Sequence, residues 1–180
     1  MEPTVRRARI ADATEVFRIA RVSWHETYDA FLGEDAVEEY VDQWYDIDDL
    51  EASIDSGVKR EEETFLVAEV DEGYGTQDVE EYGSEIVGFA DAGPDPENAD
   101  VAYLFRIYVR PEVWGEGIGT ALFEGIEAEL GDSFDRFRLS VLAENDVGVS
   151  FVESMGFERV DTRESELDPD VEAHIYEKAF

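Results

Sequence analysis

Three glycines stand at alternate positions in the middle of this chain, Gly115, Gly117 and Gly119. An apolar run with the composition of a β-strand, Tyr103–Val109, precedes them, and a stretch with helical periodicity follows them. A strand–glycine–helix junction gathers backbone N–H groups where the helix dipole is positive, and glycine lets a ligand approach closely. This arrangement suits a phosphate or pyrophosphate. The alternative is a tight strand-to-helix turn that binds no ligand.

Two nucleotide-binding motifs do not match this loop. The P-loop requires a lysine after its last glycine, but Gly119 is followed by Thr120 and Ala121. The dinucleotide fingerprint G-x-G-x-x-G requires a glycine at the position that Thr120 occupies. Neither a P-loop nor a dinucleotide site is therefore expected.

The segment Val109–Leu122 resembles the acyl-CoA-binding motif of the GCN5-related N-acetyltransferases, V-x-P-x-x-(R/Q)-G-x-G-(I/V)-G-x-x-L. Pro111 and Ile118 stand at matching positions, as do the three glycines. Trp114 departs from the motif, because the family usually has Arg or Gln there. In that family the loop amides hold the CoA pyrophosphate, so the resemblance implies a site that is weakened by the missing cation but retained.

A second segment resembles the later signature of the same family, N-x-x-A-x-x-F-Y-x-x-x-G-F. Its matching residues are Asn145, Phe151, Gly156 and Phe157, with Gly148 at the small-residue position. Asn145 alone would fit an ordinary helix N-cap. Its fixed distance from Gly156 and Phe157 makes the match specific.

The two signatures together imply an acetyl-CoA site and no metal. In the family, a backbone amide near Ile107 polarises the thioester carbonyl, and Asn145 contacts the cofactor arm. The cofactor-binding residues implied by the resemblance are Ile107, Val109, Trp114, Gly115, Gly117, Gly119, Thr120, Asn145 and Phe151.

The catalytic residues implied by the resemblance are Tyr103 and Asn145, and two departures bear on them. The tyrosine that many members use as an acid is Val152 here, and the glutamate that some members carry on the preceding strand is Tyr103. Tyr103 has two interpretations. A phenol keeps its proton at neutral pH and could protonate the leaving thiolate, or the ring could form a wall of the acceptor pocket.

Trp24 and Tyr28 are candidate substrate-binding residues. A Trp-x-x-x-Tyr pattern often lines the acceptor pocket in the helical N-terminal part of this family. The alternative is core packing of two aromatic residues that lie one helical turn apart.

The composition excludes several classes of protein and of site. At 180 residues with 43% apolar content, the chain is long enough for one well-buried domain and too apolar for general disorder. It contains no cysteine, which excludes disulfides and thiolate ligands, and its two histidines are too few for a convincing metal cluster. No apolar run is long enough for a membrane helix, and the N-terminus lacks a signal core. A cytoplasmic protein that does not bind membranes is expected.

The formal net charge of −33 arises from 47 acidic residues against 14 basic ones. Such self-repulsion destabilises a compact domain in dilute buffer, but molar salt shortens the Debye length to about 3 Å. The composition resembles that of cytosolic proteins from salt-accumulating halophiles. An acidic patch for a cationic partner is the alternative, and nucleic-acid binding is not expected because it needs the opposite charge.

The periodicity predicts an α/β (α+β) chain forming one domain over residues 1–180. The expected strands are Thr4–Ile10, Thr64–Val70, Glu85–Ala92, Tyr103–Val109, Phe137–Leu142, Glu158–Arg163 and Val171–Lys178. The expected helices begin at Asp12 in a capping-box pattern with Glu15, cover Glu34–Gln43 and Asp48–Ser56 (stopped by Gly57), and follow the glycines as far as Gly131. An exposed hairpin loop is expected over Asp71–Ser84, and Gly93–Pro96 should interrupt the chain. The resemblance implies a mixed sheet of about seven strands flanked by helices, whose central strands splay to admit the pantetheine arm.

The resulting hypothesis is an acetyl-CoA-dependent N-acetyltransferase acting on a primary amine of a small molecule, protein or peptide. A non-catalytic CoA-binding regulatory module of the same fold is the main alternative, because of Val152 and Trp114. An acidic interaction protein that does not bind CoA is a third interpretation. A homodimer is left open.

Overall fold

The computed structural model describes residues 3–71, 84–165 and 170–180. Its helices are α1 (Ala13–Leu32), α2 (Glu34–Trp44), α3 (Ile47–Lys59), α4 (Ile118–Leu130) and α5 (Asp146–Ser154), with short 3-10 turns at Ile10–Asp12 and Pro111–Val113. Its strands are β1 (Thr4–Arg7), β2 (Thr64–Asp71), β3 (Ser84–Asp95), β4 (Asn98–Val109), β5 (Arg136–Leu142), β6 (Glu158–Glu164) and β7 (Glu172–Ala179). The hairpin loop expected over Asp71–Ser84 lies almost wholly outside the described residues. None of the helices in the described ranges is long and apolar enough to cross a membrane.

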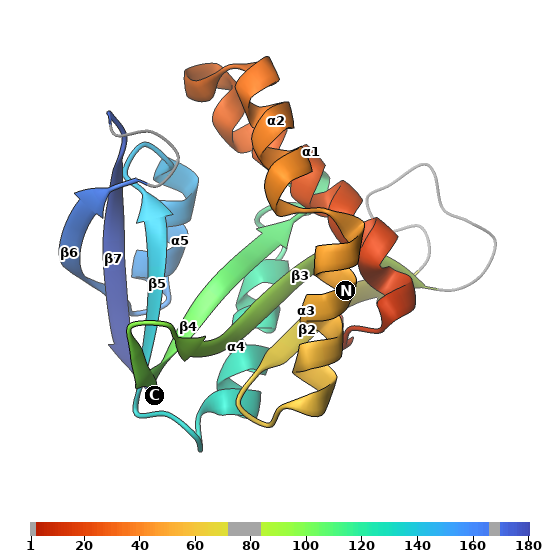
Figure 1. Ribbon diagram of the computed structural model, residues 1–180, viewed down its shortest axis with the longest axis vertical. Coiled ribbons are helices and arrows are strands. Elements are labelled where there is room, and N and C mark those ends of the chain that lie inside the picture. Colours follow the sequence, from red (N-terminus) through yellow and green to blue (C-terminus); the bar gives the residue numbers. More distant parts are fainter. Residues whose placement is uncertain (1–2, 72–83, 166–169) are drawn as a thin grey trace.

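The described strands form one seven-stranded sheet in the order β1-β2-β3-β4-β5-β7-β6. Every neighbouring pair is antiparallel except β4 and β5, which run parallel at the centre. That parallel pairing spans only Val101–Tyr103 against Arg136–Arg138, and within the described residues the two strands separate beyond it. Figure 1 shows β4 and β5 diverging as a V. The mixed sheet and the splayed central strands expected from the sequence are therefore confirmed.

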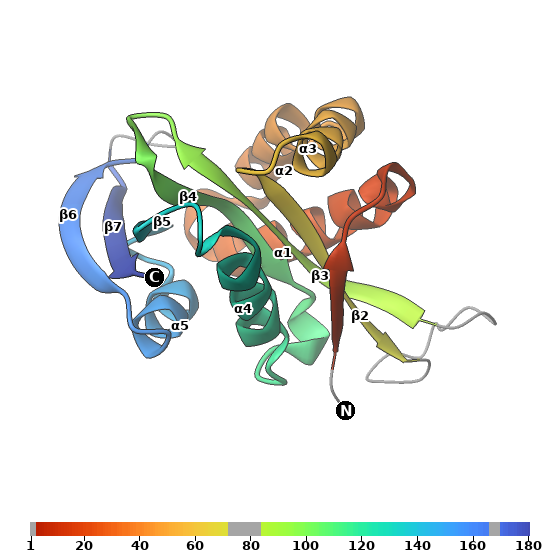
Figure 2. The ribbon, with the colours of Figure 1, turned by 90° about the horizontal axis from the view of Figure 1, so that it is seen from below.

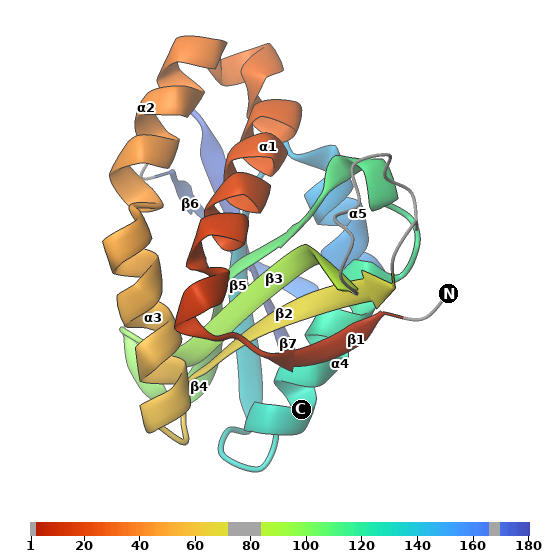
Figure 3. The same cartoon turned by 90° about the vertical axis from the view of Figure 1, so that its right-hand side faces the viewer.

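Two apolar clusters cover the two faces of the sheet, and their compositions differ. One lies beneath α4 and α5 and consists mainly of aliphatic and phenylalanine side chains such as Leu122, Ile126 and Phe137. The other lies beneath α1, α2 and α3 and includes Trp24, Tyr28 and Tyr45. Figures 2 and 3 show these helical layers on opposite sides of the strands. We call the first the cofactor face and the second the acceptor face, after the roles proposed for them below.

The start of α1 differs from the capping box expected at Asp12. The side chain of Asp12 makes no cap bond to the helix; it accepts from the Arg9 backbone N–H (2.7 Å) and from the Arg6 guanidinium (2.8 Å). The first strand accordingly ends at Arg7, and a 3-10 turn occupies Ile10–Asp12. A salt bridge to β1 therefore takes the carboxylate that the local pattern assigned to a helix cap.

Gly57 does not stop α3, contrary to the expectation from the sequence. The helix continues to Lys59, and Gly57 is buried inside it. A Cβ atom at Gly57 would lie 2.9 Å from the Phe65 backbone nitrogen. Glycine is required here because α3 packs closely against β2, and not because the helix ends.

Gly93–Pro96 does not interrupt the chain where the sequence predicts. β3 continues through Gly93 and Pro94 to Asp95, and β4 begins at Asn98. The pairing of β3 with β4 is shifted at two points, one of which leaves Phe105 as an extra residue on β4. Bulges of this kind bend a strand, which is consistent with the departure of β4 from β5 further along.

Candidate active site

The glycine loop between β4 and α4 uses its glycines in two ways. Gly115 and Gly117 have φ of +83° and +84°, and nothing lies within 4 Å of a Cβ built on either. Glycine is needed at these two positions for its backbone conformation, because residues with side chains rarely adopt this left-handed backbone. Gly119 instead allows close packing, since its Cβ would lie 3.2 Å from the ring of Phe151 on α5. The loop therefore has a fixed shape and is held against α5.

The N-terminus of α4 differs from those of the other described α-helices. Gly117 is the N-cap and provides no side-chain cap bond, and the first turn contains no acidic residue. The first turns of the other four described α-helices all contain one or two acidic residues. In a chain with 47 acidic residues, α4 is the one described α-helix whose first turn, free of acidic side chains, offers its N–H groups and partial positive charge to an external anion.

The inner edge of β4 carries backbone groups that face the gap. Arg110 donates its N–H to the carbonyl of Val87 at 2.8 Å, which marks a hydrogen-bonded position opposite β3. Because such positions alternate in an antiparallel pair, Ile107 and Val109 occupy the non-hydrogen-bonded positions. Their N–H and C=O groups consequently point away from β3, towards the side from which β5 has departed.

Two side chains already contact one of these groups, the carbonyl oxygen of Val109. The Ser23 hydroxyl on α1 donates to it at 3.1 Å, and the indole Nε1 of Trp114 donates at 2.7 Å. Trp114, which replaces the cationic residue of the motif, thus lies over the end of β4 while 36% of its surface stays exposed. Ser23 was not anticipated from the sequence, because one serine in an amphipathic helix gives no signal.

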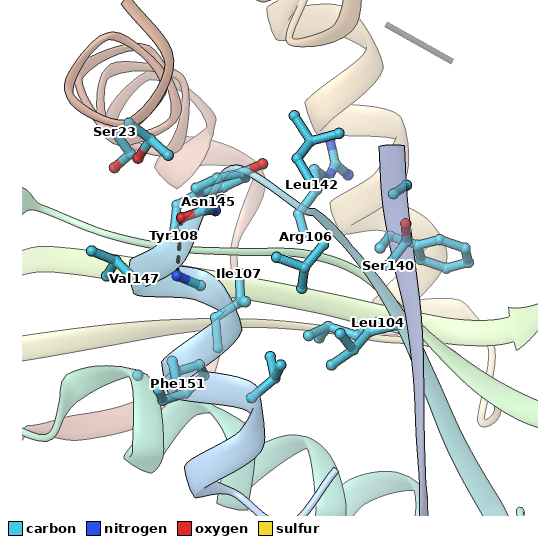
Figure 4. A pocket seen from close by; sticks show the side chains of 18 of the residues that line it. Ser23, Leu104, Arg106, Ile107, Tyr108, Ser140, Leu142, Asn145, Val147 and Phe151 are labelled. Carbon is cyan, nitrogen blue, oxygen red and sulfur yellow. Dashed lines mark hydrogen bonds between the residues drawn. The ribbon is translucent and has the colours of Figure 1, made fainter. Parts of the chain in front are cut away.

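A cavity of about 890 Å³ occupies the space between the splayed strands and continues towards the N-terminal helices. It is lined by α1, β4, the glycine loop, β5 and α5. Figure 4 shows Ser23 of α1, Ile107 and Tyr108 of β4, and Asn145 and Phe151 of α5 and its N-cap converging there. All residues that the sequence singled out for cofactor, catalytic or acceptor roles line this one cavity: Trp24, Tyr28, Tyr103, Ile107, Val109, Trp114, Gly115, Gly117, Gly119, Thr120, Asn145 and Phe151.

Asn145 connects the start of α5 to the acceptor face. Its Oδ1 accepts from the Gly148 N–H at 2.9 Å, which is the N-cap bond expected from the sequence. A Cβ atom at Gly148 would lie 2.6 Å from the Asn145 Nδ2, so a small residue is needed here for the amide to keep this position. The Nδ2 group donates to the hydroxyl of Tyr28 at 3.4 Å. One amide group therefore fixes both the start of α5 and the position of a tyrosine on α1.

Trp24 and Tyr28 combine the two roles that the sequence left open. Both are at least 94% buried in the cluster of the acceptor face, with ring centroids 4.7 Å apart, and both line the cavity. The Trp24 Nε1 donates to the Tyr45 hydroxyl at 3.1 Å. Burial raises the pKa of Tyr28 well above its ordinary value and that of Tyr45 to about 12. Both phenols therefore keep their protons at neutral pH.

Tyr103 and Val152 occupy other parts of the same cavity. Tyr103 is the last residue of β4 that pairs with β5, and its ring lies 5.6 Å from that of Phe105. Val152 is 3% exposed and packs in the cluster of the cofactor face. An aliphatic side chain thus stands where many family members have their acid.

A buried ion pair on the acceptor face was missed by the sequence analysis. Arg106 donates to both carboxylate oxygens of Asp91, at 2.9 and 2.7 Å, and its guanidinium lies 5.7 Å from the centroid of the Tyr45 ring. Burial lowers the pKa of Arg106, but Asp91 outweighs this effect and the net change is upward. The signal was available in the sequence, because Asp91 and Arg106 are the single charges within the apolar runs 86–92 and 101–109.

No cluster of three or more potential metal ligands occurs among residues 3–71, 84–165 and 170–180.

Comparison with known proteins agrees with this arrangement. The family model described as Acetyltransferase (GNAT) family matches residues 21–157. A spermidine N(1)-acetyltransferase from Thermoplasma acidophilum is 28% identical over 168 residues, covering 93% of this chain and 95% of that protein. The crystal structure of PaiA N-acetyltransferase from the same organism, in complex with coenzyme A, superposes with a TM-score of 0.80, 26% identity and full coverage of both chains. The YncA protein from Salmonella typhimurium, solved with its cofactor acetyl-CoA, shares the fold at a TM-score of 0.71 and 16% identity, covering 99% of this chain and 94% of that one.

Proposed function

The chain belongs to the acetyltransferase (GNAT) family, and on that premise we propose that it transfers the acetyl group of acetyl-CoA to a primary amine. The observation that carries the proposal is the N-terminus of α4, which has no acidic residue in its first turn and whose glycine loop has a fixed shape. A pyrophosphate at this position would accept hydrogen bonds from the free N–H groups and be favoured by the helix dipole.

The pantetheine arm of the cofactor would lie between β4 and β5. The backbone groups of Ile107 and Val109 face that gap and can bond the amides of the arm, which would satisfy polar groups that are costly to leave unpaired. Asn145 is fixed at the far side of the gap and is placed to contact the same arm. Phe151 and Thr120 line the entrance between α4 and α5.

The reaction is a direct attack of a neutral amine on the thioester carbonyl. The C–N bond forms and the C–S bond breaks, the nitrogen gives up a proton, and the thiolate takes one up. In this proposal the Ile107 amide donates to the carbonyl oxygen as negative charge develops on it, which is the family's way of lowering the barrier. The cavity contributes by orienting the two reactants and excluding water.

The acceptor proposed here is a small molecule with more than one amino group. Two observations support it: the relative named as a spermidine N(1)-acetyltransferase, and the net charge of −33, which attracts cations to the surface. The aromatic side chains Trp24, Trp44 and Tyr108 line the acceptor side of the cavity and can contact an alkylammonium group. A protein or peptide amine is the competing acceptor class within the same reaction.

Acetyl-CoA turnover with a panel of amines tests this proposal. Spermidine, spermine, putrescine, a lysine-containing peptide and an N-terminal peptide would each be incubated with the protein, measuring free thiol release and the mass of the product. We expect the polyamines to be acetylated, with a higher kcat/KM than either peptide. CoA binding by calorimetry without transfer to any amine would favour the non-catalytic regulatory module instead.

The acidic composition is proposed to be an adaptation of a cytoplasmic protein to a salt-rich cytoplasm. Thermal midpoints measured from about 0.1 M to 3 M KCl should rise, because salt screens the repulsion among exposed carboxylates. A midpoint that does not change across this range would mean that the charge serves another purpose.

A further inference from the structure

Expulsion of CoA creates a thiolate that must take up a proton, and the position that often supplies it is apolar in this chain. Val152 is 3% exposed and has no proton to donate. A free thiol has a pKa of about 8.5, and burial raises it further, so a thiolate released inside the cavity is a strong proton acceptor. A nearby group that keeps its proton at neutral pH would accelerate this step.

Tyr28 lies on α1, 117 residues away from its partner Asn145 in sequence. Its hydroxyl oxygen accepts from the Asn145 Nδ2 at 3.4 Å. Since the amide donates, the phenol proton is not used in this contact. Among the described residues, no side chain or backbone oxygen is found to accept that proton. Tyr28 therefore presents a hydrogen-bond donor to the cavity that it lines.

The position of the phenol is fixed by its surroundings. Tyr28 is 6% exposed and packs against Trp24 and Phe31, with ring centroids 4.7 and 5.5 Å away. On the cavity side, Asn145 is itself held by the Gly148 N–H. Ser23, which precedes Tyr28 on the same helix, contacts the carbonyl of Val109 across the gap. The α1 helix thus spans from the end of β4 to the start of α5, above the space proposed for the cofactor arm.

We propose that Tyr28 is the general acid of the reaction, held in place by Asn145, and that it replaces the acid missing at Val152. This inference rests on the proposed acetyltransferase function. As the amine nitrogen bonds to the carbonyl carbon and the C–S bond breaks, the Tyr28 hydroxyl transfers its proton to the sulfur. The proton lost by the amine nitrogen passes to water, and the phenolate regains a proton from solvent. The products are the N-acetylated amine and CoA thiol, with no net change in protons.

Asn145 has a distinct part in this arrangement. Its Nδ2 donates to the Tyr28 oxygen, which stabilises the phenolate that forms when the proton leaves. It also orients the lone pairs of that oxygen so that the proton points into the cavity. Asn145 acts on the acid as a positioning residue, in addition to its proposed contact with the cofactor.

Tyr28→Phe tests the proposal by removing only the hydroxyl. We expect kcat for acetyl transfer to fall by about 10²–10⁴-fold, with CoA affinity measured by calorimetry unchanged. Tyr176→Phe is the matched control, because Tyr176 is 1% exposed and its hydroxyl donates to Glu153, away from the cavity. The control should retain wild-type kcat.

A second substitution separates catalysis from packing. Tyr28→3-fluorotyrosine keeps the ring and the hydroxyl but lowers the phenol pKa, which makes the group a stronger acid, so kcat at neutral pH should rise. A purely structural role for the hydroxyl would leave kcat unchanged. This variant retains the hydrogen bond from Asn145 and therefore also tests the proposal if Tyr28→Phe does not fold.

Three results would overturn the inference. The first is Tyr28→Phe with wild-type kcat, and the second is a fluorotyrosine variant whose kcat at neutral pH equals that of the wild type. The third is a loss of kcat in Tyr103→Phe and not in Tyr28→Phe, which would make Tyr103 the acid. Failure of the proposed function is distinguishable from all three, because the wild-type protein itself would then acetylate no amine.

Discussion

The two faces of the central sheet serve one cavity but are built differently. The cofactor face places a cluster of mainly aliphatic and phenylalanine side chains beneath α4 and α5, and its polar groups are backbone amides at a glycine loop. The acceptor face places a cluster that also contains Trp24, Tyr28 and Tyr45 beneath α1, α2 and α3, and its polar groups are side chains such as Arg106 and Tyr28. The glycine loop is one continuous segment, whereas the polar side chains of the acceptor face come from positions far apart in sequence.

This difference follows from the ligands that each face is proposed to hold. A pyrophosphate is recognised by backbone N–H groups, which every residue carries, so the loop needs a backbone shape more than particular side chains. An amine acceptor and a proton-transfer step need particular side chains at particular positions. The acceptor face therefore has to bury polar groups, and it does so with the Asp91–Arg106 pair and hydrogen-bonded phenols. The predictions below test whether the two faces are separable in this way.

The largest expected effect is on the stability of the acceptor face. Arg106→Met leaves the Asp91 carboxylate buried without its partner, and we expect a loss of about 3–5 kcal/mol in the free energy of unfolding. Chemical denaturation monitored by fluorescence measures it. Arg163→Met is the control, because Arg163 is half exposed and pairs with Asp161 on the surface, where such contacts contribute little to stability.

The double variant Asp91→Leu with Arg106→Met completes this test. Removing both charges should recover much of the lost stability, since the cost arises from one unpaired buried charge. If the single Arg106→Met variant is as stable as the control, the buried pair does not organise the acceptor face.

The next effect is on the cofactor face. Gly117→Val forces a β-branched residue into a backbone with φ of +84°, which costs about 1–3 kcal/mol. Because the loop can relieve this strain only by changing shape, CoA affinity should fall by about 5- to 100-fold. Calorimetric titration with CoA measures it.

Gly33→Val provides the matched control for the glycine loop. Gly33 has φ of +90° and, like Gly117, nothing within 4 Å of its Cβ, but it joins α1 to α2. The Gly33→Val variant should lose about as much stability as Gly117→Val but leave CoA affinity unchanged. Equal losses of CoA affinity in both variants would show that the two faces are not separable.

A smaller effect is expected at Trp114, where the motif usually has a cation. Trp114→Arg adds a positive charge beside the proposed pyrophosphate site, and exposed charge pairs contribute up to about 1 kcal/mol. CoA affinity should rise by about fivefold at low salt, and the gain should shrink as salt is added. Trp114→Ala removes the indole without adding a charge, so a gain of the same size in that variant would contradict the electrostatic explanation.

The smallest effect concerns His25, which connects α1 to α2 at the edge of the acceptor face. Its Nδ1 lies 2.8 Å from Asp29 and its Nε2 2.5 Å from Glu38, which also pairs with Arg21. Burial opposes protonation of His25, but the two carboxylates outweigh it and raise the pKa. The stabilisation of the folded protein by protonated His25 is therefore fully present below the pKa that His25 has in the unfolded state. It is lost as the pH rises through the higher pKa of His25 in the folded state.

His25→Gln should remove this pH-dependent stabilisation. Because both carboxylates are more than one-third exposed, we expect a contribution of at most about 1 kcal/mol. Unfolding free energies of wild type and variant, compared between pH 6 and pH 9, measure it, with His174→Gln as a control on β7. A wild-type protein that becomes more stable over this range relative to His25→Gln would reverse the sign and refute the assignment.

Local sequence signals predicted the strand–glycine–helix junction and the Asn145 cap, because both depend on neighbouring residues. The positive φ of Gly115 and Gly117 and the N-cap bond from Asn145 to Gly148 each involve residues within three positions of one another. Local signals predicted the wrong role for a residue where contacts with a distant segment determine its position. Asp12 pairs with Arg6 in place of capping α1, and Gly57 allows α3 to approach β2 in place of ending the helix.

The sequence by itself determined the strand–glycine–helix junction, the capped start of α5 and the excess of negative charge. Each follows from backbone conformation or composition, which neighbouring residues or simple counts decide. Only the tertiary structure decided that β4 leaves β5 after Tyr103, that Arg106 pairs with Asp91, and that Tyr28 meets Asn145. These contacts depend on strand register and on helices packing across the sheet. Their free energy comes from the whole buried cluster, so no local pattern encodes them.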